Sequence, residues 1–164
     1  MLDYTITGMK VFISYGALAD QVTALRLQAL AAVNGLTVFV PPAYTRQEVP
    51  TLLDPDVAQK LSASEVVLGV VGAGLSEACK QELTAGLDQR KHMIVMSDPT
   101  YLPQLSPHFA SNLVVVDPFH PDQSERSMVE HLKLIDAQHN AKNALLALGT
   151  LTLGLLLFAP ADHR

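Results

Sequence analysis

Short apolar runs alternate along this chain with longer stretches whose apolar residues recur every three or four positions. The run from Val66 to Val71 is continuously apolar and rich in β-branched residues, which is typical of a strand buried on both faces of a sheet. Four other apolar runs resemble it, and together they predict five strands, over residues 10–15, 36–40, 66–71, 92–96 and 112–116. Strands that alternate with helices predict a parallel sheet covered by helices on both faces.

The stretches between these runs carry helix signals. Asp20 suits the first turn of a helix over residues 19–33, and Asn34–Gly35 is a common helix stop. The packing face of this helix is expected to hold its periodic apolar residues, Val22, Leu25, Leu30 and Val33. Further helices are predicted over residues 52–61, 76–89 and 121–142, and irregular connections over residues 43–53 and 98–108.

Candidate chemistry gathers just after the third strand. Gly72 and Gly74 end that strand, and Ser76 stands where a helix N-cap belongs. Ser76, Cys79 and Glu82 are three residues apart, so they lie close together on the first turns of the helix. Open α/β sheets hold their ligands at the carboxyl ends of their strands. This pattern makes Glu82 the candidate catalytic residue.

The far end of the chain has a different composition. Residues 144–161 carry no charge and are rich in leucine, and eighteen uncharged residues just reach the length that crosses a hydrocarbon core. We therefore divide the chain into a domain over 9–135, a helical linker over 136–143 and a transmembrane helix over 144–161. The alternative is a hydrophobic C-terminal helix that packs on the domain or in an oligomer.

Composition and charge bear on the expected partners and on the location of the protein. The chain has 164 residues and a net charge of −5, with no basic patch, so a nucleic-acid partner is not expected. The N-terminus lacks the order of a signal peptide, and a single cysteine fits a reducing compartment. These features predict a cytoplasmic domain anchored to the inner membrane by its C-terminal helix.

Three further chemistries lack their motifs. The six histidines do not pair at metal-ligand spacing beside acids or cysteine, so no metal is expected. The first strand is not followed by Gly-x-Gly-x-x-Gly, and no phosphate-binding Gly-Lys-Ser/Thr loop occurs, which argues against hydride transfer and nucleotide hydrolysis.

Four features in order resemble the TIR domain, particularly its bacterial members. They are Val-Phe-Ile-Ser-Tyr at residues 11–15, an acid at Asp20, Gly-x-x-Val-Phe at residues 35–39, and Ser-x-x-Cys-x-x-Glu-Leu at residues 76–83. The resemblance covers roughly residues 9–135. It implies a flavodoxin-like, five-stranded parallel sheet with helices on both faces, followed here by the C-terminal hydrophobic helix.

The resemblance also implies an activity. In enzymatic TIR domains the glutamate of this motif cleaves the N-glycosidic bond of NAD, and that role falls on Glu82. NAD is then a substrate, and no cofactor is needed. The product would be ADP-ribose or a cyclic ADP-ribose-type signal in bacterial antiphage immunity. The loop over residues 41–53 would close over the site and mediate self-association with other TIR domains.

Other residues are candidates for binding the substrate, each with a structural alternative. Ser14, Tyr15 and Asp20 lie at the end of the first strand, where they either contact the substrate or cap and pack. Tyr44 and Arg46 either close on the adenine or phosphates or are exposed loop side chains. Ser76 and Cys79 accompany Glu82, and Cys79 is either a nucleophile or a packing residue.

Two other functions stay open. The chain is alternatively a TIR adaptor that assembles with other TIR domains and has no activity. A third possibility is a nucleoside deoxyribosyltransferase-like N-glycosidase, a class that shares the topology and has a glutamate in a similar place.

Overall fold

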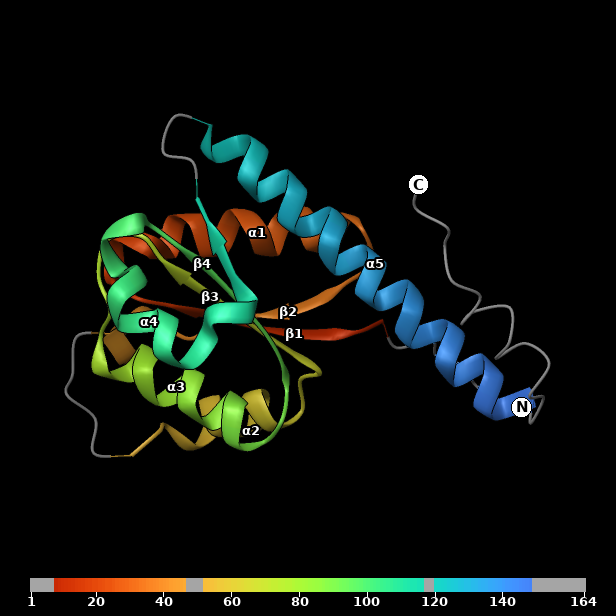
Figure 1. The fold of residues 1–164 in the computed structure, drawn as a ribbon. Helices are drawn as coiled ribbons and strands as arrows, with labels where there is room; N and C mark the ends of the chain where they lie inside the picture. Colours follow the sequence, from red (N-terminus) through yellow and green to blue (C-terminus); the bar gives the residue numbers. More distant parts are fainter. Residues whose placement is uncertain (1–7, 47–51, 117–119, 149–164) are drawn as a thin grey trace.

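The computed structural model in Figure 1 describes residues 8–46, 52–116 and 120–148. Its strands form one sheet in the order β2-β1-β3-β4-β5, and every neighbouring pair is parallel. The strands are β1 (Lys10–Tyr15), β2 (Thr37–Phe39), β3 (Val66–Val71), β4 (His92–Ser97) and β5 (Leu113–Val115). The predicted parallel sheet is confirmed, and each strand begins and ends within one residue of its expected bounds.

Helices cover both faces of the sheet. In the described ranges the α-helices are α1 (Gln21–Val33), α2 (Pro55–Ser62), α3 (Glu77–Asp88), α4 (Leu102–Phe109) and α5 (Pro121–Leu148). Short 3-10 helices are η1 (Leu18–Asp20), η2 (Ala43–Arg46), η3 (Pro99–Tyr101) and η4 (Ala110–Asn112). Helices α1 and α5 lie on one face, while α2, α3 and α4 lie on the other (Figure 1).

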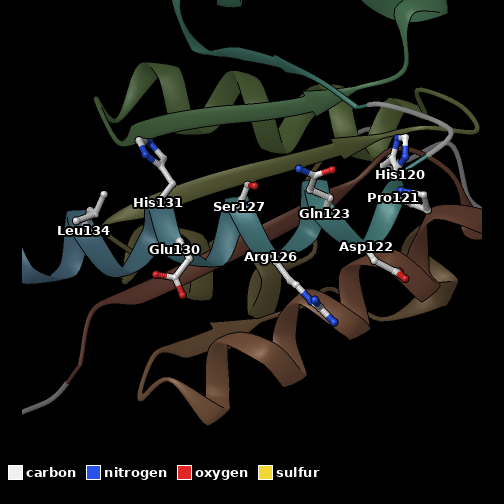
Figure 2. A pocket seen from close by; sticks show the side chains of 9 residues that line it. All are labelled: His120, Pro121, Asp122, Gln123, Arg126, Ser127, Glu130, His131 and Leu134. Carbon is white, nitrogen blue, oxygen red and sulfur yellow. The ribbon is translucent and has the colours of Figure 1, made fainter.

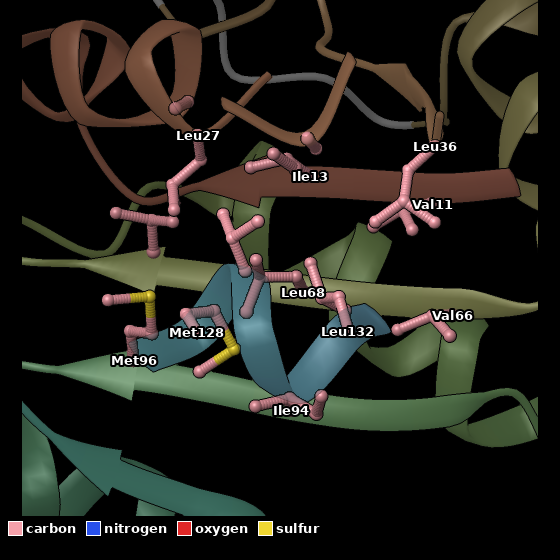
Figure 3. Close-up of a cluster of buried hydrophobic side chains, with 14 of the residues drawn as sticks. Val11, Ile13, Leu27, Leu36, Val66, Leu68, Ile94, Met96, Met128 and Leu132 are labelled. Carbon is pink, nitrogen blue, oxygen red and sulfur yellow. The ribbon is translucent and has the colours of Figure 1, made fainter. Parts of the chain in front are cut away.

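The two faces of β1 belong to different cores. Val11 and Ile13 pack with α1 and α5 residues such as Leu27 and Leu132, as Figure 3 shows. Phe12 points to the opposite face and packs with residues of α2, α3 and α4. Because side chains alternate along a strand, Ser14 shares the face of Phe12 and is directed toward α3.

The predicted packing face of α1 is wrong. Val22, Leu25 and Val33 are 59%, 46% and 87% exposed, and Leu30 is also exposed. The face that packs against the sheet consists instead of two alanines and one leucine, Ala24, Ala31 and Leu27. The helix has apolar residues on both faces, so periodicity alone did not determine which one is buried.

Part of the stretch predicted as irregular, residues 98–108, is helical. Asp98 Oδ1 accepts a hydrogen bond from the Thr100 amide at 2.9 Å and caps η3, which leads into α4. Leu105 and Phe109, one helical turn apart in α4, are both buried against the sheet. Pro107 lies inside this helix, and a proline in a sequence usually argues against a helix at that position.

Helix α5 continues beyond its predicted end near residue 142 and reaches Leu148, extending past the sheet in Figure 1. Most of the hydrophobic segment predicted to cross a membrane, residues 144–161, lies outside the described residues. Among the helices that the structure describes, none combines the length and the apolar character needed to span a bilayer.

Candidate active site

The candidate site is built where α3 meets the carboxyl end of β1. The Ser76 hydroxyl oxygen caps α3 by accepting a hydrogen bond from the Cys79 amide at 3.3 Å. The Ser76 amide in turn donates to the Gly16 carbonyl oxygen at 2.7 Å, directly after β1. These two bonds fix the start of the helix over the strand end, so that Cys79 and Glu82 both face Ser14.

Glu82 is the centre of this arrangement. The residue is 1% exposed, although it lies at the edge of the sheet where ligands usually bind. Its Oε1 atom accepts a hydrogen bond from the Ser14 hydroxyl at 2.8 Å. The same hydroxyl oxygen lies 3.2 Å from Cys79 Sγ. Sequence spacing had placed Cys79 beside Glu82, and the sheet brings Ser14 to both of them.

Arg46 makes a two-pronged ion pair with Glu82. Its Nη2 atom donates to Glu82 Oε1 at 2.5 Å and its Nη1 atom donates to Glu82 Oε2 at 2.8 Å. The Arg46 side chain is 0% exposed, so both charges are removed from water. A buried charge of this kind requires a partner, because an unpaired one is strongly unfavourable.

The rest of the guanidinium group is also occupied. Arg46 Nε donates to the Tyr15 carbonyl oxygen at 2.8 Å, and Nη1 also donates to Thr45 Oγ1 at 2.9 Å. The guanidinium carbon lies 4.1 Å from the centroid of the Tyr15 ring. The Tyr15 hydroxyl donates to the Pro41 carbonyl oxygen at 2.8 Å, which holds that ring in place. Arg46 is therefore a central residue of the site and not an exposed loop side chain.

Burial is the main effect on the pKa values of Glu82 and Cys79. It raises the pKa of the Glu82 carboxyl, while the hydrogen bonds and the charge of Arg46 and the hydrogen bond from Ser14 oppose that rise. Burial also raises the pKa of the Cys79 thiol to about 12. At neutral pH the thiol is protonated, which makes it a packing group and a poor nucleophile.

The Asp20 carboxylate is bound by backbone amides of two loops and has a structural role. Its Oδ1 atom accepts from the Ala73 amide at 2.9 Å, and its Oδ2 atom accepts from the Ala17 amide at 3.1 Å. A Cβ atom at Gly72 would lie 2.7 Å from Asp20 Oδ1, so a side chain there would have to displace the Asp20 carboxylate. Asp20 thus ties the loop after β1 to the loop after β3, beside the Glu82 cluster.

A small cavity adjoins Glu82 on the side of α2. It has a volume of about 120 Å³ and is lined by Tyr44, Thr45, Leu52, Leu53, Asp54, Val57, Ala78 and Glu82. The half-exposed Tyr44 hydroxyl is 3.3 Å from Asp54 Oδ2, and Asp54 also caps α2. Ligand pockets usually measure about 300–1,000 Å³, so this cavity does not admit a dinucleotide as it stands.

A larger hollow lies elsewhere. An open groove of about 840 Å³ follows α5 from His120 to Leu134, with Arg126 and His131 among its lining residues, as Figure 2 shows. None of the site residues predicted from the sequence lines it. In the described part of the chain, no group of three or more His, Cys, Asp or Glu side chains is arranged to hold a metal ion.

Two polar residues of the site were not predicted. Thr45 accepts a hydrogen bond from Arg46, and its own hydroxyl donates to the carbonyl oxygen of Pro42, just before η2, at 2.6 Å. Asp54 lines the cavity and is bonded to Tyr44. The sequence offered one signal, since an acid directly before Pro55 is typical of a helix N-cap.

Neither the comparison with protein-family models nor the comparison with curated proteins gave a match. The function of the Glu82 site is therefore inferred from its residues and their geometry.

Proposed function

We propose that this chain is a bacterial TIR-type enzyme that cleaves the nicotinamide-ribose bond of NAD in immune signalling, with Glu82 as the catalytic residue. The observation that carries the proposal is the buried Glu82 carboxylate at the carboxyl edge of the parallel sheet, hydrogen-bonded to Ser14. The strand order β2-β1-β3-β4-β5 is the flavodoxin-like order, whose ligands bind at this edge near the switch between β1 and β3.

The chemistry suits a single carboxylate. The bond between C1′ of the ribose and the pyridinium nitrogen breaks, and its electron pair neutralises the departing nicotinamide. The positive charge that develops at C1′ is stabilised by the Glu82 carboxylate. Water then adds to C1′ and releases a proton, which gives ADP-ribose, or a hydroxyl or ring nitrogen of the same molecule adds and gives a cyclic product. Because the leaving group is already cationic, no general acid is required, unlike in glycosidases with two carboxylates.

The ion pair also favours a second candidate function. Arg46 neutralises Glu82, and the adjoining cavity is too small for NAD. A TIR module that only assembles with other TIR domains would retain such a pair as part of its core. Turnover of NAD distinguishes the two functions.

The test is to incubate the purified full-length chain with NAD and to follow nicotinamide release, with nucleosides in parallel. Wild-type protein is expected to release nicotinamide, and Glu82→Gln is expected to lower the rate by about 100-fold or more, because it removes the charge that stabilises the cation. Circular dichroism and thermal unfolding show whether the variant is folded.

The matched control is Glu77→Gln, which removes a carboxylate from the exposed side of the same helix. It is expected to retain wild-type turnover. Wild-type turnover by a folded Glu82→Gln variant would show that the site is assigned wrongly. Cleavage of nucleosides but not of NAD would favour the deoxyribosyltransferase-like class, and no cleavage of either would favour the assembly module.

A further inference from the structure

In the free protein, the candidate catalytic carboxylate of Glu82 is already occupied by hydrogen-bond donors of the protein itself. Both oxygens of Glu82 accept hydrogen bonds from Arg46, and one of them also accepts from Ser14. A carboxylate whose charge is matched by a guanidinium 2.5–2.8 Å away contributes little to stabilising a cation on a substrate. The pair must therefore separate, or change partners, before Glu82 can act.

Arg46 cannot simply be left without an acceptor. Its guanidinium is fully buried, and of its hydrogen-bond partners among the described residues, the Tyr15 carbonyl and the Thr45 hydroxyl would remain if Glu82 turned away. Neither of these is charged. A substrate that draws Glu82 toward its ribose must then supply an anion to Arg46, or else leave a buried positive charge without a counter-ion.

A phosphate group fits this requirement. Guanidinium binds carboxylate and phosphate with the same pair of parallel N–H donors, so that one can replace the other without moving Arg46 far. The Tyr15 ring beneath the guanidinium and the Nε bond to the Tyr15 carbonyl stay available to orient it during the exchange.

We propose that Arg46 is a specificity-determining residue that exchanges Glu82 for a phosphate of the substrate, and that this exchange releases the carboxylate for catalysis. The inference rests on the proposed N-glycosidic cleavage and names its substrate class. The substrate is a nucleotide whose scissile ribose carries a phosphate or diphosphate, and the corresponding nucleoside is a poor substrate because it cannot displace Glu82 from Arg46.

The test compares NAD with nicotinamide riboside, which has the same leaving group and ribose but lacks the diphosphate and the adenosine attached to it. Wild-type protein is expected to have the higher kcat/KM for NAD. Arg46→Met is expected to lower the ratio of the two kcat/KM values by about 10- to 100-fold, as expected for the loss of a charge-assisted pair of hydrogen bonds. The control is Arg126→Met, an exposed arginine of α5, which should leave the ratio unchanged.

A second measurement gives its main result on the wild-type protein. Inorganic pyrophosphate, added to wild-type protein with nicotinamide riboside, is expected to accelerate cleavage because it takes over Arg46 and frees Glu82. The same addition to Arg46→Met should have no effect. A purely structural role of Arg46 would not produce this activation.

The outcomes separate the two levels of inference. If Glu82→Gln abolishes cleavage but the substrate ratio in folded Arg46→Met equals that of the wild type, the exchange is refuted and the cleavage stands. Inhibition by pyrophosphate, or no effect of it on the wild type, also overturns the exchange. If folded Glu82→Gln cleaves both substrates at the wild-type rate, the proposed function itself fails.

Discussion

Two opposing effects determine the pKa of a buried carboxylate such as Glu82. Removal from water favours the protonated form, and the two donors that point at it, Arg46 and Ser14, favour the ionised form. The pKa is raised on balance, so the protonated form is the one that folding favours. This contribution to stability is present at low pH and is lost as the pH rises through the raised pKa.

The same shift predicts a pH dependence of activity. Because catalysis needs the ionised form, kcat/KM for NAD should fall on acidification, with its midpoint above the ordinary glutamate value of about 4.3. Arg46→Met removes the cation that opposes protonation, so its acid limb should lie at higher pH. A profile measured from pH 4 to pH 9 checks both results. A midpoint at the ordinary value, or one that Arg46→Met leaves in place, would contradict this account of Glu82.

The residues of the site differ in how far the sequence could predict them. Cys79 and Glu82 follow from one local motif, because positions three apart on a helix are neighbours. The partnership of Arg46 with Glu82 joins residues 36 positions apart and depends on how η2 packs against α3. Sequence spacing carries no information on such a contact, so the sequence alone does not distinguish a substrate-binding Arg46 from an exposed loop side chain.

At the scale of the element, helix ends were easier to predict than helix faces. Asn34–Gly35 was expected to stop α1, and the Gly35 and Leu36 amides donate to Ala32 and Ala31 carbonyl oxygens at 3.1 and 3.0 Å, which is a Schellman motif. Its apolar face was predicted wrongly, since β-branched and leucine side chains also occur on the exposed side. Close approach to the sheet favoured the side that carries alanines.

The C-terminal cap of α1 leads to a prediction about stability. Gly35 has a φ angle of 79°, and a Cβ atom there would meet no heavy atom within 4 Å, so the cost of a side chain is purely conformational. Gly35→Ala should lower the free energy of unfolding by about 1 kcal/mol. Gly35→Asn should lower it by less, because asparagine tolerates this conformation better. Urea unfolding measures both, and an unchanged midpoint in Gly35→Ala would show that α1 does not need this stop.

At the scale of the whole molecule, the regular alternation of strands and helices made the parallel sheet predictable. Membrane attachment and self-association stay predictions, since they concern residues 149–164 or other copies of the chain. The hydrophobic segment 144–161 begins inside α5, and the remainder lies beyond the described residues.

Membrane attachment is tested in the full chain. Leu151→Arg places a charge in the middle of the segment and should cost about 2.5–3.5 kcal/mol of insertion, which moves protein from the membrane fraction to the supernatant. The control is Leu134→Arg, because Leu134 is 63% exposed on α5 and the same substitution there should not change the distribution. Wild-type protein that is monodisperse without detergent would contradict the anchor.

The buried thiol beside Glu82 gives the chain a built-in reporter. Cys79 is the only cysteine of the protein, and it is 0% exposed under the contact between α3 and β1. A chromogenic disulfide reagent can therefore reach sulfur only when that contact separates. The rate of labelling then follows how often the site opens, with no added fluorophore and no engineered label. Comparing the labelling rate with and without pyrophosphate shows whether the exchange at Arg46 changes how often this contact separates, independently of turnover.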